Sequence, residues 1–446
     1  MISKKTEQLV IATVGFFWAF LMWFSTAAFS TSIDSAFGLT TGGLALLASS
    51  ALWLAPPGRV IAGWAADRFG AHNTFAAILA YSGLMSIASA FATNYDVLFV
   101  ERLVVASAGI SFVVGIQHVS QWFDDHEIGT AEGIYAGTGN AGAGVGALVL
   151  PRLYGTNFGD AFLHLGIVAL VIAVVYKWRG EPAKDVATAE TARSNAGIKD
   201  TLYVWTRFAA IGLMLAYAMS FGLEIAMNSW LPTYYASGFQ DAIAGLGFTG
   251  VAAIQTAAGT FAAVQSFNAS LFRPFSGYMS DLWQRKEWTP YPFLSAEQEY
   301  APRVHWLMTA LLLITLMMCA LTVAGTMGLL PVSVVVLAGF GIAVSFGTGG
   351  VFAIVPLMFK DRPGIAAGFI GGISTAGGIV YPLVFGWIPD IHMGYAAVAI
   401  VFFVPFIAFF VWAMRSEQSL SEHGIGSRER WLGPEKPTNA VPGGDD

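Results

Sequence analysis

Two arginines stand inside long apolar runs, and each begins the same spaced pattern. The pattern is Arg-x-x-x-Gly-x-x-x-Asp, and it occurs as Arg59, Gly63 and Asp67 and again as Arg273, Gly277 and Asp281. A guanidinium near the centre of a bilayer costs about 2.5–3.5 kcal/mol on insertion scales, and it cannot lose its charge. A spacing of four places the three side chains on one helix face.

The depth of these arginines follows from helix geometry. The first apolar run stops at Asp67 and Arg68, which therefore mark an interface. Eight residues at about 1.5 Å each place Arg59 about 12 Å inside a hydrocarbon core that is about 30 Å thick. The same arithmetic gives Arg273 the same depth. Two buried positive charges facing one cavity predict a site for a small anion.

The composition is that of an integral membrane protein. Of 446 residues, 56% are apolar and 11% charged, and the mean hydropathy is +0.63. Soluble domains average about 25% charged residues. Lipid-exposed backbone must satisfy its hydrogen bonds within its own segment, so the fold class is all-α. The single cysteine, Cys319, excludes a disulfide framework within the chain. The N-terminal apolar run lacks a cleavage site and is predicted to be the first membrane helix.

Apolar runs and their breaks predict twelve transmembrane helices in two six-helix, pseudo-symmetric halves. The predicted spans are 9–31, 43–66, 73–93, 96–123, 129–151, 160–178, 207–236, 247–280, 304–327, 331–359, 364–388 and 394–414. The corresponding regions are an N-terminal half (1–178), a central cytoplasmic loop (179–206), a C-terminal half (207–415) and a cytoplasmic disordered tail (416–446).

The distribution of basic residues predicts the orientation. On one side fall Lys4, Lys5, Arg68, Lys177 to Arg207, Arg285, Lys286, Arg303, Lys360, Arg362 and Arg415 onward. Only Arg102 and Arg152 fall on the other side, and Arg102, near a helix end, is expected to be structural. By the positive-inside rule, both termini and the central loop are cytoplasmic, in a multi-pass protein of the cell membrane.

Further matches between the halves indicate an internal repeat. Ser111-Phe112 matches Ser345-Phe346, and the glycine-rich segment 133–142 matches 368–377. Two such halves, with substrate bound between them near mid-membrane, are the architecture of the major facilitator superfamily.

The motifs carry a closer resemblance. GWAADRFGAH (63–72) resembles the loop motif of that superfamily, and GYMSDLWQRK (277–286) is a degenerate second copy. The glycine-rich segments 131–153 and 346–382 are similar to the two signature segments of the nitrate/nitrite porter family. The likeness covers nearly the whole chain apart from the central loop and the tail.

The resemblance implies roles for individual residues. It implies that Arg59 and Arg273 clamp the anion, inside an aromatic sandwich and polar wall made by Phe112, Asn140, Tyr217 and Phe221. It implies a gating role for the loop-motif residues Gly63, Asp67, Arg68, Gly277 and Asp281. The aromatic side chain of the first helix is either Trp23 or Phe24, and the second-half signature lacks a second asparagine.

The chemistry of these residues suits nitrate. Nitrate is planar and singly charged, so two arginine forks can grip it in plane while aromatic rings cover its faces. Each residue also has a plainer interpretation: the arginines could pair with carboxylates, the aromatic rings could be core, and Asn140 could join two helices. Glu224, one turn beyond Phe221, is a candidate proton carrier; the plainer alternatives are that it neutralises one cavity arginine or reaches the outer water.

The predicted function is secondary transport of nitrate, with nitrite as a second substrate, by a carrier that works as a monomer. A carrier of another small monovalent anion such as formate remains open, as does the choice between proton symport and nitrate/nitrite exchange. The chain has no HExxH, GxSxG or cysteine cluster and no nucleotide-binding loop. We therefore expect no enzyme activity, metal, cofactor or nucleic-acid partner, and energy from ion gradients.

Overall fold

The computed structural model describes residues 3–123, 127–182, 207–294, 299–359 and 363–422. Within these residues the chain is helical, and each of the twelve predicted spans coincides with a helical segment. Nine helical segments of this part are long and apolar enough to cross a membrane. The other three predicted spans are α5, α8 and the pair α15–α16.

The first half contains six long helical segments, two of which are irregular in the middle. Its elements are α1 (Lys4–Ala28), α2 (Ser30–Phe37), α3 (Thr41–Ser50), α4 (Ala55–Phe69), α5 (Ala71–Ser89), α6 (Tyr95–Ala106), η1 (Ser107–Ile110), α7 (Ser111–Ser120), α8 (Ile128–Tyr154) and α9 (Phe158–Arg179). The segment α3–α4 is interrupted at 51–54, and a short 3-10 helix, η1, joins α6 to α7.

The second half repeats this plan. Its elements are α12 (Phe208–Tyr217), η2 (Ala218–Gly222), α13 (Leu223–Gly238), α14 (Gln240–Gly245), α15 (Val251–Leu271), α16 (Arg273–Arg285), η3 (Pro292–Leu294), α17 (Ala301–Thr326), α18 (Leu330–Met358), α19 (Pro363–Ser374), α20 (Gly377–Trp387), α21 (Met393–Val398), η4 (Ala399–Phe403) and α22 (Val404–Glu422). The helix α22 continues past the predicted boundary at 415, so 416–422 are helical. Most of the predicted central loop and tail (183–206 and 423–446) lies outside the described residues.

Prolines place the two arginines next to helix breaks. Pro56 and Pro57 lie in the first turn of α4, and Arg59 follows them. Arg273 is the first residue of α16, and Pro274 the second. The first turn of a helix leaves backbone N–H groups without intrahelical partners, so a residue without an N–H costs little there. Both arginines thus lie at the start of a helix, directly after the chain has changed direction.

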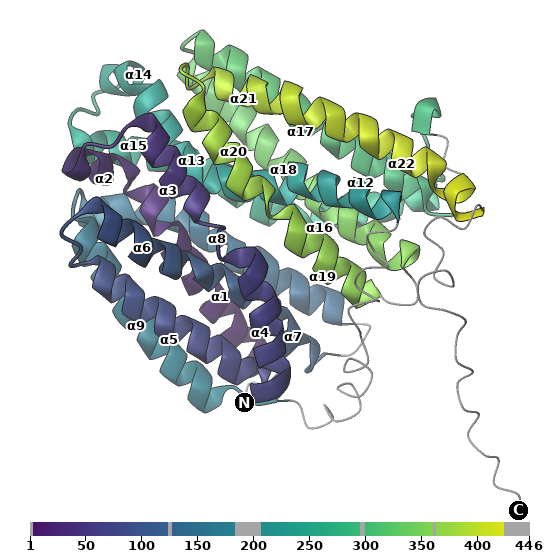
Figure 1. Cartoon of the computed structure of the whole chain (residues 1–446), viewed down its shortest axis with the longest axis horizontal. Helices are drawn as coiled ribbons and strands as arrows, with labels where there is room; N and C mark the ends of the chain where they lie inside the picture. Colours follow the sequence, from purple (N-terminus) through teal and green to yellow (C-terminus); the bar gives the residue numbers. More distant parts are fainter. Residues whose placement is uncertain (1–2, 124–126, 183–206, 295–298, 360–362, 423–446) are drawn as a thin grey trace, which may run out of the picture.

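The two halves are packed against each other at one end of the molecule. There α8 packs against α15, α3 against α20, and both α1 and α3 against α13. A methyl group on Gly259 would lie 2.2 Å from the carbonyl oxygen of Ala147, and one on Gly386 would lie 2.1 Å from the methyl of Ala45. Only glycine permits so close an approach. We call this the closed end; in Figure 1 it is the left side, with α2 and α14.

The opposite end carries the start of α1 and the end of α22, and we call it the open end (Figure 1). Among the described residues, space is open beside five glycines of this end: Gly63, Gly133, Gly277, Gly368 and Gly372. The first two belong to the first half and the other three to the second. The contrast between the ends indicates halves that meet at one end and separate at the other.

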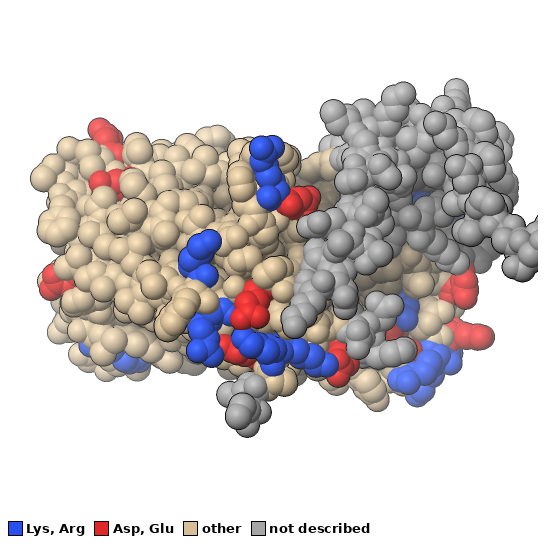
Figure 2. All heavy atoms as spheres, turned by 90° about the horizontal axis from the view of Figure 1, so that it is seen from below, with Lys and Arg blue, Asp and Glu red and all other residues tan. Residues whose placement is uncertain are grey.

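Charge is unevenly distributed over the surface. In Figure 2, most lysine and arginine side chains lie along the middle and lower part of the face with acidic side chains among them, while the left-hand part is mostly uncharged apart from a few charged side chains near its edge. Exposed apolar side chains such as Val60, Leu84, Val174 and Val335 lie on the outside of the helices. An uncharged outer surface of this kind is what a bilayer requires.

Candidate functional site

Arg59 reaches from the first half to the second. Its Nη1 donates a hydrogen bond of 3.1 Å to the carbonyl oxygen of Gly371 on α19. Its Nε is buried and has no hydrogen-bond partner among the described residues. A guanidinium has five N–H donors, so Arg59 retains donors for a ligand.

Arg273 has a different set of partners. Its Nη2 donates to both carboxylate oxygens of Glu224, each at 2.8 Å, and the two side chains are 14% and 2% exposed. The plainer interpretation of Glu224, that it neutralises a cavity arginine, matches this contact. The Nε of Arg273 is buried and, like that of Arg59, has no partner within the described part of the chain.

Asn140 connects Arg273 to the first half. A guanidinium offers only donors, so the amide of Asn140 is oriented with its oxygen toward Arg273. In that orientation the oxygen accepts from Nη2 at 3.1 Å and also from Nη1. The side chain is 2% exposed and lies on α8. Its NH₂ group remains the donor side of the amide, available to an anion.

Two phenyl rings from opposite halves face each other near the arginines. The ring centroids of Phe112 and Phe221 lie 6.5 Å apart, with the planes inclined by 30°. A flat ion between two rings needs about 7 Å, twice the van der Waals contact distance of about 3.5 Å. The guanidinium carbon of Arg273 lies 5.8 Å from the Phe221 centroid. The structure therefore brings the two rings of the predicted sandwich to nearly the spacing that a flat ion needs.

Tyr217 completes the second-half wall. Its ring stacks on Phe221 with centroids 5.2 Å apart, and it meets Phe352 edge-on at 5.0 Å. Its hydroxyl lies within electrostatic range of both arginines and of Glu224. The structure thus gathers all six predicted binding residues, together with Glu224, around one region between the halves.

A π-helix sets the spacing of this wall. The turn η2 (Ala218–Gly222) widens the helix between α12 and α13, and it contains Phe221. Such single-turn bulges are frequent at functional sites because they re-aim side chains within an otherwise regular helix. Tyr217 lies just before the bulge and Glu224 just after it. No residue pattern in the sequence signals this turn.

The first-half ring is supported by residues that the sequence did not single out. Phe16 on α1 packs against Phe112 with centroids 5.4 Å apart. The hydroxyl of Tyr135 donates to the carbonyl oxygens of Ser111 and Phe112, each at 3.2 Å. Gly139 has no side chain because a methyl there would lie 1.9 Å from the Phe16 ring. Phe16 is therefore the aromatic residue of the first helix that contacts the site wall.

Trp23 and Phe24, the two predicted alternatives for that aromatic, lie elsewhere. Their rings stack on each other at 4.7 Å, and both line a separate cavity nearer the closed end. The indole of Trp23 donates to the carbonyl oxygen of Ala51 at 2.8 Å.

The loop-motif residues lie toward the open end. Asp67 accepts a 2.7 Å hydrogen bond from the amide of Gln117, and Asp281 pairs with Arg303 at 2.8 Å. Arg68 lies over the Trp64 ring at 5.7 Å. None of these contacts crosses between the halves. Their predicted gating role stays a prediction.

The arrangement can bind a small flat anion. Two guanidinium groups and one amide provide N–H donors, two rings provide the faces, and the surrounding side chains are mostly buried. Oriented N–H donors hold an anion most strongly where water is excluded.

Comparisons with known proteins agree with the predicted fold and family. A family model described as Major Facilitator Superfamily matches residues 11–296. A probable nitrate/nitrite antiporter of Thermus thermophilus is 27% identical over 86% of this chain and 85% of its own length. A nitrate/nitrite transporter of Nostoc punctiforme is 25% identical over 83% and 85%. A nitrite extrusion protein of Bacillus subtilis is 22% identical over 86% and 87%. The resemblance predicted from the motifs is thereby confirmed.

Solved structures agree on the fold. A bacterial homologue of the human lysosomal transporter Spinster superimposes with a TM-score of 0.68 at 16% identity, covering 94% of this chain and 98% of that one. A D-xylose–proton symporter superimposes with a TM-score of 0.63 at 13% identity, covering 93% and 97%. The predicted all-α transporter fold is confirmed.

Proposed function

The chain belongs to the Major Facilitator Superfamily, whose family model matches more than half of it, and from this premise we propose that it exchanges nitrate and nitrite across a cell membrane. The observation that carries the proposal is the pair of guanidinium groups, one from each half, that each contact the opposite half. An anion bound to both would join the halves at mid-membrane. The names of relatives similar over most of the chain support nitrate and nitrite as substrates.

The charges around the site match a monovalent anion. Arg273 is neutralised by Glu224, and Arg59 has no carboxylate partner within 4.0 Å among the described residues. The empty site therefore carries one net positive charge, and the site holding nitrate or nitrite carries none. A dianion such as sulfate would leave a negative charge in a low-dielectric cavity, which is costly.

The same charges favour exchange over proton symport. Movement of the empty site through the membrane interior would transfer an uncompensated charge, whereas the loaded site is neutral. Glu224 accepts two hydrogen bonds from a guanidinium, and such bonds stabilise the ionised form of a carboxylate. We therefore assign it as a fixed counter-charge rather than a proton carrier.

The orientation and conformation follow from the surface charges. The open end bears most of the lysines and arginines, among them Lys4, Lys5, Arg68 and Arg207. By the positive-inside rule this end, with both termini, faces the cytoplasm, and the structure is the inward-facing state of a plasma-membrane carrier. One chain contains the whole site, which supports a functional monomer. A reporter fused after Met414 tests the orientation: an external signal would reverse it.

The deciding experiment is flux of labelled nitrate into proteoliposomes. We expect rapid uptake when nitrate or nitrite is inside and little uptake into empty vesicles, with or without an inward proton gradient. Formate at equal concentration should compete weakly, because a C–H edge cannot accept the third set of hydrogen bonds. Strong competition by formate would favour the alternative function, in which the protein carries small carboxylates.

Glu224→Gln sharpens the test of exchange. The loaded site would then carry a net positive charge, so exchange should slow about tenfold or more, the effect of 1.4 kcal/mol or more on the barrier. Glu224→Asp, which keeps the charge, is the matched control and should retain more activity. Concentrative uptake into empty vesicles driven by a proton gradient, and lost in Glu224→Gln, would instead make Glu224 the proton carrier.

A further inference from the structure

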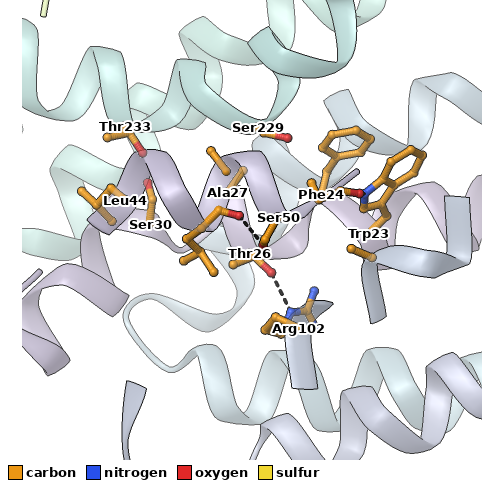
Figure 3. Close-up of a pocket in the computed structure, with 14 residues that line it drawn as sticks. Trp23, Phe24, Thr26, Ala27, Ser30, Leu44, Ser50, Arg102, Ser229 and Thr233 are labelled. Carbon is orange, nitrogen blue, oxygen red and sulfur yellow. Dashed lines mark hydrogen bonds between the residues drawn. The ribbon is translucent and has the colours of Figure 1, made fainter. Parts of the chain in front are cut away.

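A second cavity lies between the halves, closer to the closed end than the arginine pair. It is enclosed by α1, α2, α3 and α6 of the first half and by α13 of the second, as Figure 3 shows. In this conformation the space open to a water-sized group is about 20 Å³. That is room for about one water molecule.

Arg102 on α6 provides the charge of this cavity. Its Nε donates to Thr26 Oγ1 at 2.6 Å, and its Nη2 donates to Met22 O and Ser25 Oγ, each at 2.8 Å. The side chain is 2% exposed, and its Nη1 is buried with no partner within the described ranges. An orphaned N–H on a buried cation is costly and calls for a ligand.

No carboxylate compensates this guanidinium directly. Among the described residues, Arg102 forms no ion pair within 4.0 Å. Glu101 precedes it and is near enough to interact electrostatically, yet its buried Oε2 also lacks a hydrogen-bond partner. The Phe162 ring lies 4.2 Å from the guanidinium carbon, so one face of the cation is covered and its edge remains for a ligand.

Two hydroxyl groups that line the same cavity also lack partners. Ser30 Oγ, from the first half, and Ser229 Oγ, from the second, are both buried without a hydrogen bond in the described part. Hydroxyl groups can donate to an anion. Ser229 is on α13, which packs across the boundary between the halves. If the halves separate at this end, α13 would move away from the first-half helices that line the cavity, and the cavity would open.

A row of rings on α1 connects this cavity with the arginine pair. Phe112 contacts Phe16, Phe16 contacts Phe20, and Phe20 contacts Trp23 on the cavity wall. The centroid distances are 5.4, 4.9 and 5.0 Å. The seven helical steps from Phe16 to Trp23 span about 10 Å of helix. The cavity is therefore about two turns from the arginine pair, along the direction of transport.

We propose that Arg102, with Ser30 and Ser229, forms a second binding site for a small monovalent anion. The site is occupied in the opposite conformation, in which the two halves have separated at the end that is closed here. It receives the anion before the anion passes to Arg59 and Arg273. In the present state α13 closes the cavity down to the size of one water. The inference rests on the proposed function, since it concerns the same anion on the same path.

The test compares the apparent KM for labelled nitrate at the two membrane faces, in right-side-out and inside-out vesicles. For Arg102→Gln the KM at the face of the closed end should rise about tenfold, the effect of losing one charge-assisted hydrogen bond. The KM at the opposite face should change less than about twofold on the same scale. Arg152→Gln removes an exposed positive charge from the same end together with its hydrogen bond to Thr260 Oγ1 of the second half, and it is the matched control: it should not raise the KM at this face alone.

Ser229→Val keeps the test decisive if Arg102→Gln fails to insert. It leaves every bond between Arg102 and α1 intact, fills the cavity with an apolar group, and should raise the KM at the same face alone. Equal KM values at that face in the parent and in Ser229→Val, in protein of unchanged melting temperature, would overturn the proposal. If the parent itself moves no nitrate, the proposed function fails first; if the parent moves nitrate and the variants match it, only this second site is lost.

Discussion

Arg59 and Arg273 occupy matching places in a repeated pattern, yet their surroundings differ. Arg59 donates to one backbone carbonyl, that of Gly371, whereas Arg273 is bound by the carboxylate of Glu224 and the amide of Asn140. The first helix of the first half, α1, has no acidic residue beyond Glu7, so it supplies no counterpart of Glu224. The repeat thus contains two cations, and a carboxylate present in only one half reduces the net charge to that of a single cation.

The difference assigns separate tasks to the two arginines. Under the proposed function, Arg59 would provide the uncompensated charge that attracts the anion. Arg273 provides oriented donors at little net charge and ties α16 to α13 and α8. Symmetry in sequence therefore does not imply symmetry in electrostatics, and substitutions at the two positions should fail in different ways.

The largest expected effect is loss of transport when either arginine is replaced by lysine. Lysine keeps the charge but loses the planar fork, so we expect nitrate exchange to fall by at least about a hundredfold, the loss of two or more charge-assisted hydrogen bonds at about 1.5–3 kcal/mol each. Labelled nitrate exchange in proteoliposomes measures it. Parent-like exchange in either lysine variant would exclude the clamp.

The two positions separate when the charge itself is removed. Arg273→Gln leaves Glu224 buried without its partner, which typically costs about 3–5 kcal/mol, so its melting temperature should fall sharply. Arg59→Gln breaks no ion pair in the described structure and should melt close to the parent. The double variant Arg273→Gln/Glu224→Gln should recover stability without recovering transport. Equal melting temperatures for the two single variants would contradict the comparison.

Much of this arrangement is predictable from sequence because it depends on periodicity within single helices. The twelve helical segments follow from apolar runs, and the predicted depths of Arg59 and Arg273 follow from the helical rise. Contacts between helices do not follow in this way. The pairing of Arg273 with Glu224 joins residues 49 positions apart, and only the folded chain fixes it among the alternatives.

Two other features were beyond sequence reasoning. The π-helix at Ala218–Gly222 has no local signal, because its wider turn is stabilised by packing rather than by residue type. The role of Phe16 depends on a glycine of another helix, Gly139, which makes room for the ring. The sequence predicted Trp23 or Phe24 as the first-helix aromatic beside the arginine pair. Both of these residues line the second cavity, and Phe16 packs against the site wall.

A middle-sized effect is expected at the facing rings, and it should also differ between halves. Phe221 stacks on Tyr217 and has the guanidinium of Arg273 over its ring, whereas no cation of the described residues lies over the ring of Phe112. Phe221→Ala should weaken nitrate binding about tenfold, and Phe112→Ala somewhat less, since aromatic contacts contribute about 0.5–1.5 kcal/mol beyond their area.

Equilibrium nitrate binding to purified protein measures these changes, and competition by larger anions measures selectivity. Both alanine variants should admit larger anions, because each removes one wall of the 6.5 Å gap. Phe→Leu at each position is the control for lost volume. If both alanine variants keep the parental affinity and selectivity, the rings are core and not a binding slot.

The smallest effect is expected at Gly63 and Gly277, the matching glycines of the repeated pattern. Space is open beside both in this state, while at the closed end Gly259 lies against the carbonyl of Ala147. If the halves rock, the open end must close as tightly in the opposite state. Gly63→Val and Gly277→Val should therefore leave nitrate binding to the inward-facing protein unchanged. Each should slow exchange about fivefold, the low end of the roughly 1–3 kcal/mol that overpacking costs.

Gly259→Val is the opposite case: it should destabilise the conformation seen here and shift the protein toward the conformation in which the closed end has opened. Cysteine-accessibility at the two ends measures that shift, and a Gly63→Val variant with both parental exchange and parental accessibility would mean that this end never closes at Gly63.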